Sequence, residues 1–314
     1  MALPSVTVVI PTRNRLGSLL HCLQTLAPYA AVNPECSIIV SDDGDAVETA
    51  AGVCGRFPQV TVVQGPKKGP AANRNHGAAQ GAGELIIFLD DDCIPEPTLI
   101  ENYRSKASEH PETDVFEGRI SAIGEMRGFA DEAPANETGG HLWSCNLAIR
   151  RELFECVGGF DERFPFAAME DMDFKLRVMK YSSPLFTPEA QVSHAYETRL
   201  GWKFTKHHAL SLLLYLNLHG IDVKERSARH FFMSSARLFV NRARAHFKKR
   251  ALKHPQQLLY QVWALFQVAW IASFWRSRGW MAKKMFPACC PNCRLLHRYI
   301  ADDLYQAFPA PLVR

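Results

Sequence analysis

Three consecutive aspartates directly follow a short apolar segment, and this junction constrains the fold more than any other feature of the chain. The apolar segment Leu85–Leu89 ends in Asp90-Asp91-Asp92. An apolar run of this length is typical of a buried strand, and open α/β sheets bind ligands at the carboxyl ends of their strands. The sequence therefore predicts a binding site at the end of this strand, with a solvated acidic turn as the alternative.

Strand and helix patterns alternate through the first part of the chain. The predicted strands are residues 6–10, 37–40, 60–63 and 85–89. Leucines at helical spacing from Leu16 to Leu26 and small residues over about 71–80 predict helices between them. This βαβαβαβ order predicts an α/β fold with a mostly parallel sheet and helices on both faces. The chain of 314 residues, 47% of them hydrophobic, is long enough to bury such a core.

Polar residues follow three of these strands and would meet at one edge of the sheet. They are Pro11-Thr12-Arg13-Asn14, Asp42-Asp43 and Asp90-Asp91-Asp92. Such an edge indicates a nucleotide cleft. No G-x-G-x-x-G follows the first strand and no G-x-x-x-x-G-K-[ST] occurs, so a glycine-rich loop is not expected to hold a pyrophosphate. Carboxylates are hard ligands, and Mn²⁺ or Mg²⁺ is expected to offset that charge instead.

The order and spacing of six segments resemble glycosyltransferase family 2 over about residues 4–200. The segments are residues 8–15, 40–44, 69–77, 88–92, 158–162 and 170–177. The resemblance implies a GT-A fold, a nucleotide-sugar donor, a divalent metal and inversion at the anomeric carbon.

The resemblance also assigns residues to the donor. Pro11, Thr12 and Arg15 would line the nucleoside pocket. Asp42 would accept an imide N–H of the base, which suits uracil or thymine and leaves guanine open. Arg74 would reach the nucleotide or diphosphate with its planar fork of donors, the alternative being an exposed helix arginine.

The resemblance assigns two residues of the aspartate triplet to the donor and one to the metal. Asp90 would contact the ribose or metal-bound water, and Asp91 is grouped with the donor-binding residues. Asp92 would bind the metal; alternate strand residues share a face, so Asp90 and Asp92 can converge while Asp91 points away. His194 follows a predicted strand at 188–192 and would be a second metal ligand, although a lone histidine is more often structural.

Asp171 is the candidate catalytic residue. It stands where a helical pattern begins, and the resemblance makes it the general base that takes the proton of an acceptor hydroxyl. An acid at such a position is also often only an N-cap, and this alternative stays open. No nucleophile from the chain is required.

Beyond residue 200 the sequence becomes helical, basic and richer in tryptophan. Basic residues gather at Arg237, Arg242, Arg244, Lys248, Lys249 and Arg250. The apolar stretch 256–275 contains Trp263, Trp270 and Trp275 but is interrupted by glutamines, so it is marginal as a membrane span. An interfacial helix on a membrane surface fits better, and a helical subdomain without membrane contact is the alternative.

The cysteines and the N-terminus bear on the cellular location. Nine cysteines show no spacing typical of a disulfide framework, and the N-terminus lacks the pattern of a signal peptide, so a reduced, cytoplasmic protein is expected. Cys290 and Cys293, with His297, form only half of a zinc pattern, and no second ligand pair is evident in the sequence.

The resemblance to glycosyltransferase family 2 implies an inverting, metal-dependent glycosyltransferase, which we expect to act in glycan, polysaccharide or glycolipid synthesis. The expected division is a GT-A domain at 1–200, with a donor half to about residue 95 and an acceptor half from about 96, followed by a helical region at 201–314. The expected partners are a nucleotide-diphosphate-sugar and a glycan or lipid-linked acceptor, with peripheral contact to the cytoplasmic face of a membrane and no nucleic acid. A catalytically silent nucleotide-sugar module and a metal-dependent phosphotransfer enzyme are the alternatives; the latter would normally need a nucleophilic aspartate near the first strand.

Overall fold

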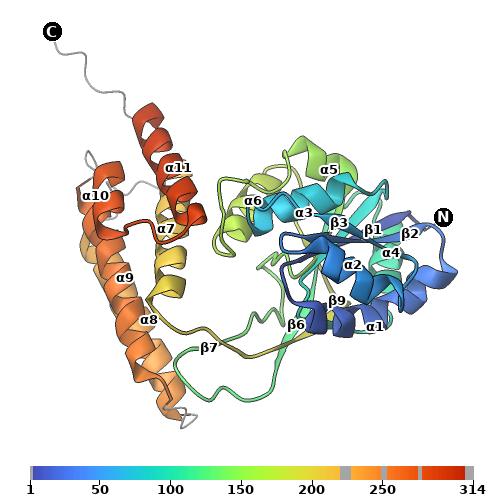
Figure 1. Cartoon of the computed structure of the whole chain (residues 1–314), viewed down its shortest axis with the longest axis horizontal. Coiled ribbons are helices and arrows are strands. Elements are labelled where there is room, and N and C mark those ends of the chain that lie inside the picture. The colour runs from blue at the N-terminus through green and yellow to red at the C-terminus, as the bar shows by residue number, and fades with distance from the viewer. Residues whose placement is uncertain (1–2, 220–227, 249–252, 275–277, 308–314) are drawn as a thin grey trace. The chain divides into compact units, whose positions relative to one another are not determined.

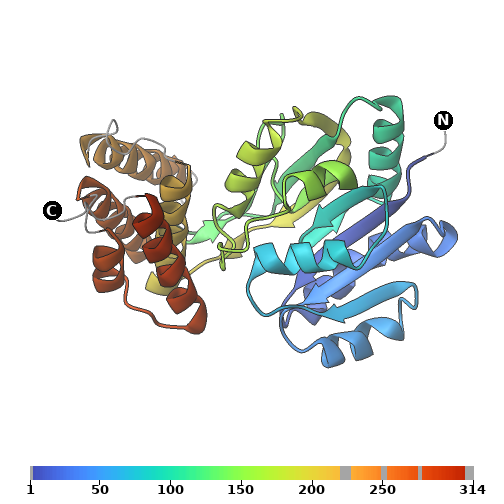
Figure 2. The same cartoon turned by 90° about the horizontal axis from the view of Figure 1, so that it is seen from above.

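The structure, a computed structural model, describes residues 3–219, 228–248, 253–274 and 278–307. The chain forms two compact units. Unit 1 comprises residues 1–124, 133–162 and 170–195, and unit 2 comprises residues 125–132, 163–169 and 196–314. Figures 1 and 2 give two views of the elements of each unit.

Unit 1 is built on an eight-stranded mixed sheet with the strand order β3-β2-β1-β4-β8-β6-β9-β5. Strands β1 to β4 run parallel, as predicted, and β8 pairs with β4 in the antiparallel sense. The strands are β1 (Val6–Thr12), β2 (Cys36–Asp42), β3 (Val60–Gln64), β4 (Leu85–Leu89), β5 (Cys93–Pro95), β6 (Val115–Ile123), β8 (Asn146–Arg150) and β9 (Leu185–Ala195).

Helices cover both faces of this sheet, which confirms the predicted α/β arrangement (Figure 1). They are α1 (Leu16–Val32), α2 (Ala46–Cys54), α3 (Pro70–Ala79), α4 (Leu99–Glu109), α5 (Arg151–Cys156) and α6 (Glu170–Val178). Every residue of β4 is buried, because alternate side chains of this central strand face the two helical layers.

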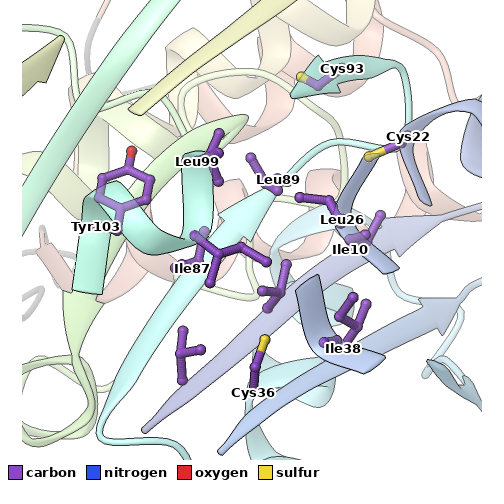
Figure 3. Packing of buried hydrophobic residues seen from close by; sticks show 14 of the residues in the cluster. Ile10, Cys22, Leu26, Cys36, Ile38, Ile87, Leu89, Cys93, Leu99 and Tyr103 are labelled. Carbon is purple, nitrogen blue, oxygen red and sulfur yellow. The ribbon is translucent and has the colours of Figure 1, made fainter. Parts of the chain in front are cut away.

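Alternate residues of β4 belong to two different hydrophobic clusters, one on each face of the sheet. Ile87 and Leu89 pack with Leu26 of α1 and Leu99 of α4 on one face (Figure 3). Phe88 packs on the other face with residues of α3, α5 and α6. A strand buried on both faces reads as a continuous apolar run, which is why its position could be predicted.

Unit 2 is mainly helical, as expected for this region. It contains α7 (Trp202–Leu218), α8 (Ala228–Lys248), α9 (Pro255–Ser273), α10 (Arg278–Met285), α11 (Pro291–Ala307) and a short antiparallel pair, β7 (Asp131–Glu132) with β10 (Glu197–Thr198). Its core joins α7, α9, α10 and α11 through residues such as Leu210, Val268 and Leu296. In the part of the chain that the structure describes, no helix has the length and apolar character needed to cross a membrane.

The exposed side of α9 is aromatic and aliphatic, whereas two of its glutamines are buried. Trp263 is 55% exposed and Trp270 43%, while Gln257 is 0% exposed and Gln267 8%. Val268 and Ile271 face the core as well, so α9 is apolar on its exposed side in addition to its buried side.

Candidate active site

The aspartate triplet lies at the centre of the sheet edge, as the order β2-β1-β4 requires. Asp91 turns back toward the first strand, where its carboxylate accepts a hydrogen bond from Thr12 Oγ1 at 2.6 Å and lies 3.1 Å from Arg15. Asp92 accepts a hydrogen bond from Arg15 Nη2, also at 2.6 Å. Arg15 therefore joins two adjacent carboxylates of the triplet.

His194 comes to Asp92 through strand pairing. In the antiparallel register of β5 and β9, Cys93 stands opposite His194, and the His194 Nε2 atom lies 3.2 Å from Asp92 Oδ1. His194 Nδ1 lies 2.7 Å from the carbonyl oxygen of Ala195. A carbonyl and a carboxylate can only accept, so the two ring nitrogens donate to Ala195 and Asp92. Burial would lower the pKa of His194, but the contact with Asp92 outweighs it and raises the pKa.

Arg74 links the triplet to the second acidic segment. The side chain comes from α3 and is buried; Nη2 donates to Asp90 at 2.7 Å and Nη1 to Glu170 at 3.3 Å. Burial would lower the pKa of this guanidinium, but Asp90, Asp171 and Glu170 together raise it. Arg74 is therefore a charged, positioned group in the interior of the site, and the alternative of an exposed helix arginine is excluded.

The carboxylate of Asp171, a residue of α6, is held by a hydrogen bond from a loop outside that helix. Helix α6 begins at Glu170, which places Asp171 inside the first turn rather than at the N-cap. One oxygen, Oδ2, accepts the backbone N–H of Ser144 at 3.2 Å. The other, Oδ1, is buried and has no hydrogen-bond partner among the described residues.

The loop that carries Ser144 is organised by a buried carboxylate. Glu117 of β6 accepts backbone N–H groups from Gly140, His141 and Leu142. Leu142 adopts a φ of 51°, an unfavourable conformation for leucine that these hydrogen bonds help to offset. Glu117 thereby fixes the segment that positions Asp171.

An open cavity of about 490 Å³ lies at the ends of β1, β2 and β3. Its lining residues are Arg13, Asn14, Asp43, Gly44, Asp45, Gln64 and Lys67. Asp43 faces this cavity, whereas Asp42 is fully buried and accepts hydrogen bonds from Gly44 N and Thr49 Oγ1 at 2.6 Å each. Pro11 and Thr12 form the adjoining end of β1.

The residues around Asp92 fit a divalent cation. Asp92 Oδ1 is buried, and the imidazole Nε2 atom of His194 stands beside it. Burial alone would raise the pKa of Asp92, but His194 and Arg15 outweigh it and lower the pKa. The site thus keeps an ionised hard oxygen together with an imidazole nitrogen, a donor pair that suits Mn²⁺ or Mg²⁺.

The charge balance also favours a cation. The carboxyl groups of Asp90, Asp91, Asp92, Glu170 and Asp171 lie around two guanidinium groups, those of Arg15 and Arg74, and the imidazole of His194. Burial raises the pKa of Asp91 to about 7, against the opposing effects of Arg15 and Thr12. Clustered carboxylates that repel one another are stabilised by a bound cation.

The sequence analysis gave no role to three residues that lie at the candidate site. Glu170 contacts Arg74, Glu117 holds the loop that carries Ser144, and Asp43 lines the cavity. Glu170 and Asp43 stood beside residues already selected, so adjacency was an available signal. Glu117 had none, because its role depends on a loop that is 23 or more residues distant along the chain.

Comparison with known proteins agrees with this geometry. The fold, an α/β sheet with acids at the end of β4, is of the GT-A type. Residues 7–158 match the family described as Glycosyl transferase family 2, and the chain carries a domain of that family.

Among its relatives is a pre-mycofactocin glycosyltransferase of Mycobacterium tuberculosis, 29% identical over 62% of this chain and 43% of the relative. The O-antigen biosynthesis protein RfbC of Myxococcus xanthus is 31% identical over 56% of this chain and 16% of that protein. The chain thus spans less than half the length of these two relatives.

Solved structures share the fold at low identity. The mannosyltransferase PcManGT from Pyrobaculum calidifontis, in complex with GDP-Man and Mn²⁺, is 17% identical with a TM-score of 0.51, covering 98% of this chain and 82% of that one. GalNAc-T7 with UDP, GalNAc and Mn²⁺ is 16% identical with a TM-score of 0.50, covering 68% and 48%. At this identity the likeness concerns the fold alone.

The buried Glu170 carboxyl predicts a pH-dependent stability. Burial, followed by the neighbouring Asp171, raises the pKa of Glu170 from 4.5 to about 8. The stability from the retained proton is therefore complete below about pH 4.5 and is lost as the pH rises through 8. We expect Glu170→Gln to gain stability relative to the wild type between pH 5.5 and 8.5, by at most about 1.4 kcal/mol per pH unit.

Urea denaturation of both proteins at several pH values measures this difference. Glu155→Gln is the matched control, because the Glu155 side chain is 65% exposed. A difference between wild type and Glu170→Gln that stays constant or shrinks as pH rises would contradict the assignment.

Proposed function

We propose that this protein is an inverting glycosyltransferase that moves a sugar from a nucleotide-diphosphate donor to an acceptor hydroxyl. One observation carries the proposal: two buried carboxylate oxygens, Asp92 Oδ1 beside His194 Nε2 and Asp171 Oδ1 without a hydrogen-bond partner among the described residues, belong to two acidic segments that Arg74 joins. The oxygen beside the imidazole suits a metal that balances the diphosphate, and the other suits the proton of an acceptor. The GT-A domain would occupy residues 1–200, with the donor half to about 95 and the acceptor half from about 96.

The donor would lie along the strand ends. The open cavity would take the nucleoside beside Pro11 and Thr12. Asp42 and the cavity-lining Asp43 each accept two hydrogen bonds from within the chain, one at each oxygen. A carboxylate oxygen has a second lone pair, so we propose that this acidic segment, with Asp42 as the residue that the resemblance assigns, accepts the N–H of the base.

The diphosphate would lie near the acidic centre of the site. Asp92 and His194 would hold Mn²⁺ or Mg²⁺, which when bound supplies Lewis-acid stabilisation of the leaving diphosphate. Asp90 would contact the ribose or a water molecule, and Arg74 would orient Asp90 and offer its guanidinium toward the phosphates. Arg15 and Asp91 would keep the triplet in place.

Asp171 would act as the general base. Its Oδ2 atom is fixed by Ser144 N, which leaves Oδ1 to accept the proton of the attacking hydroxyl. Burial raises the pKa of Asp171, which increases its basicity. Direct attack by the acceptor displaces the diphosphate and inverts the anomeric carbon without a nucleophile from the chain.

The acceptor is proposed to be a glycan or lipid-linked saccharide. The names of relatives support this class: one is an O-antigen biosynthesis protein, and another is a glucosyltransferase acting on an undecaprenol-linked saccharide, 33% identical over 112 residues. A catalytically silent nucleotide-sugar module is the competing function. A phosphotransfer enzyme is disfavoured, because the residues after the first strand, Pro11-Thr12-Arg13-Asn14, include no aspartate that could act as its nucleophile.

The test of the function is donor turnover with a panel of UDP-, GDP- and dTDP-sugars. We expect one or more donors to bind and to release nucleoside diphosphate with Mn²⁺ or Mg²⁺, and EDTA or Asp92→Asn to remove turnover. Asp114→Asn, a change at a surface carboxylate, should leave turnover unchanged. Binding without any turnover would favour the silent module, and full turnover of Asp92→Asn in EDTA would refute the metal mechanism.

A second prediction separates catalysis from binding at Asp171. Asp171→Asn should lower turnover about 10²- to 10⁴-fold, because a general base acts mainly in the transition state. Donor affinity, measured by calorimetry, should change little. An equal loss of donor affinity, with folding intact by circular dichroism, would make Asp171 a structural residue.

We further propose that unit 2 binds the cytoplasmic face of a membrane as a peripheral surface. Arg237, Arg244 and Lys248 of α8 are exposed, and α9 exposes Trp263 and Trp270. Aromatic side chains and basic residues together favour an anionic interface. Lys249, Arg250 and Trp275, and the side chain of Arg242, belong to the same expectation but lie outside the described residues.

Vesicle sedimentation tests this surface. The protein should bind phosphatidylglycerol vesicles at low salt and be released by high salt. Arg237→Gln/Arg244→Gln/Lys248→Gln should weaken binding about 100-fold, since each basic residue contributes about 1 kcal/mol. Trp263→Ser/Trp270→Ser should also weaken it, whereas Tyr181→Ser, at an exposed residue of unit 1, should not. Equal binding by all variants, or none by the wild type, would end this proposal.

A further inference from the structure

Three cysteines and one histidine converge in unit 2. His207 lies on α7, Cys289 and Cys290 lie between α10 and α11, and Cys293 lies in the first turn of α11. One potential ligand atom from each residue lies within 4.8 Å of all the others. Chain segments far apart in sequence thus bring four metal-ligating side chains to one point.

The sulfur separations suit a shared metal rather than a disulfide. The Cys290 and Cys293 sulfurs are 3.3 Å apart, and those of Cys289 and Cys293 are 3.5 Å apart. A disulfide would need about 2.05 Å, and all three cysteines are free. In a tetrahedral zinc site with Zn–S bonds of about 2.3 Å, the sulfurs lie roughly 3.8 Å apart, close to the spacing already present.

The histidine is held in place and lacks a polar partner. The His207 ring stacks on Phe166 with centroids 3.8 Å apart and an interplanar angle of 6°. Its Nε2 atom is buried and has no hydrogen-bond partner among the described residues. A buried polar nitrogen without a partner is costly, and coordination to a metal would remove that cost.

A lysine supplies the charge that such a centre needs. The Lys206 side chain is 3% exposed, and its Nζ atom donates to Cys289 Sγ at 3.0 Å and to the Pro287 carbonyl at 2.8 Å. Three thiolates, a neutral imidazole and Zn²⁺ together carry one negative charge, which Lys206 balances. Hydrogen bonds to ligand sulfurs are the outer contacts that stabilise thiolate centres.

We propose that His207, Cys289, Cys290 and Cys293 form a structural zinc site that joins α7 to the start of α11. Soft thiolate ligands with one imidazole select zinc, and four protein ligands leave no open position for catalysis. His297, the histidine suggested by the sequence pattern, is not one of the four clustered residues. The two ligands that the sequence pattern did not include are Cys289, which adjoins Cys290, and His207, which comes from α7.

Metal content and cobalt titration test the site in the full-length protein. Protein purified in reductant without chelator should contain one zinc per chain. After removal of zinc, Co²⁺ should bind with the absorption of a tetrahedral thiolate complex, and Zn²⁺ should displace it. This titration of the wild-type protein does not depend on whether a variant folds.

Variants identify the ligands. Cys290→Ser and Cys293→Ser should lose stoichiometric zinc, and His207→Gln should bind at least tenfold more weakly. Cys54→Ser, at an exposed cysteine of unit 1, and Asp92→Asn should both retain zinc. If the reduced wild-type protein takes up neither Zn²⁺ nor Co²⁺, or if Cys290→Ser/Cys293→Ser retains full zinc, the proposal is overturned; a Cys290–Cys293 disulfide without metal uptake would identify a redox pair instead.

Discussion

The candidate site depends on the two hydrogen bonds that the buried guanidinium of Arg74 donates to carboxyl groups. Arg74 reaches from α3 to Asp90 at the end of β4 and to Glu170 at the start of α6. Removing Asp90 from this contact would be far more costly than losing a surface ion pair, because the buried charge of Arg74 would stay in a medium of low polarity. The same side chain links the acidic segment that we propose to bind the metal with the segment that we propose to accept the proton. Stability and proposed catalysis therefore rest on one side chain.

The parallel half of the sheet could be predicted because its signals are local. Each of the four strands is a short apolar or β-branched run, and the acids that follow β4 need only the strand order to meet the end of β1. His194 could be selected for its position after a predicted strand, and the pairing of β5 with β9 brings it to Asp92. The antiparallel strands and the Glu117-bound loop depend on contacts between distant segments, which periodicity does not encode.

The packing of the helices in unit 2 also could not be predicted from the sequence. The helices themselves are evident from the sequence, but which face of each helix is buried is not. In α9, Gln257 and Gln267 point inward while Trp263 and Trp270 are exposed, so a rule that buries aromatic residues would orient this helix wrongly. Likewise, Cys290 and Cys293 are visible as a pair, whereas the approach of His207 depends on the packing of α7 beside α11.

The central claim is that the Asp92–His194 pair holds the divalent cation that serves the donor diphosphate. Anomalous diffraction from crystals grown with Mn²⁺ and a nucleoside diphosphate tests it most directly. The account predicts a manganese peak within coordination distance of Asp92 and His194 Nε2, and its loss in Asp92→Asn. A nucleotide-bound structure with manganese elsewhere, or with His194 still paired to Asp92 and no metal between the chain and the diphosphate, would contradict it.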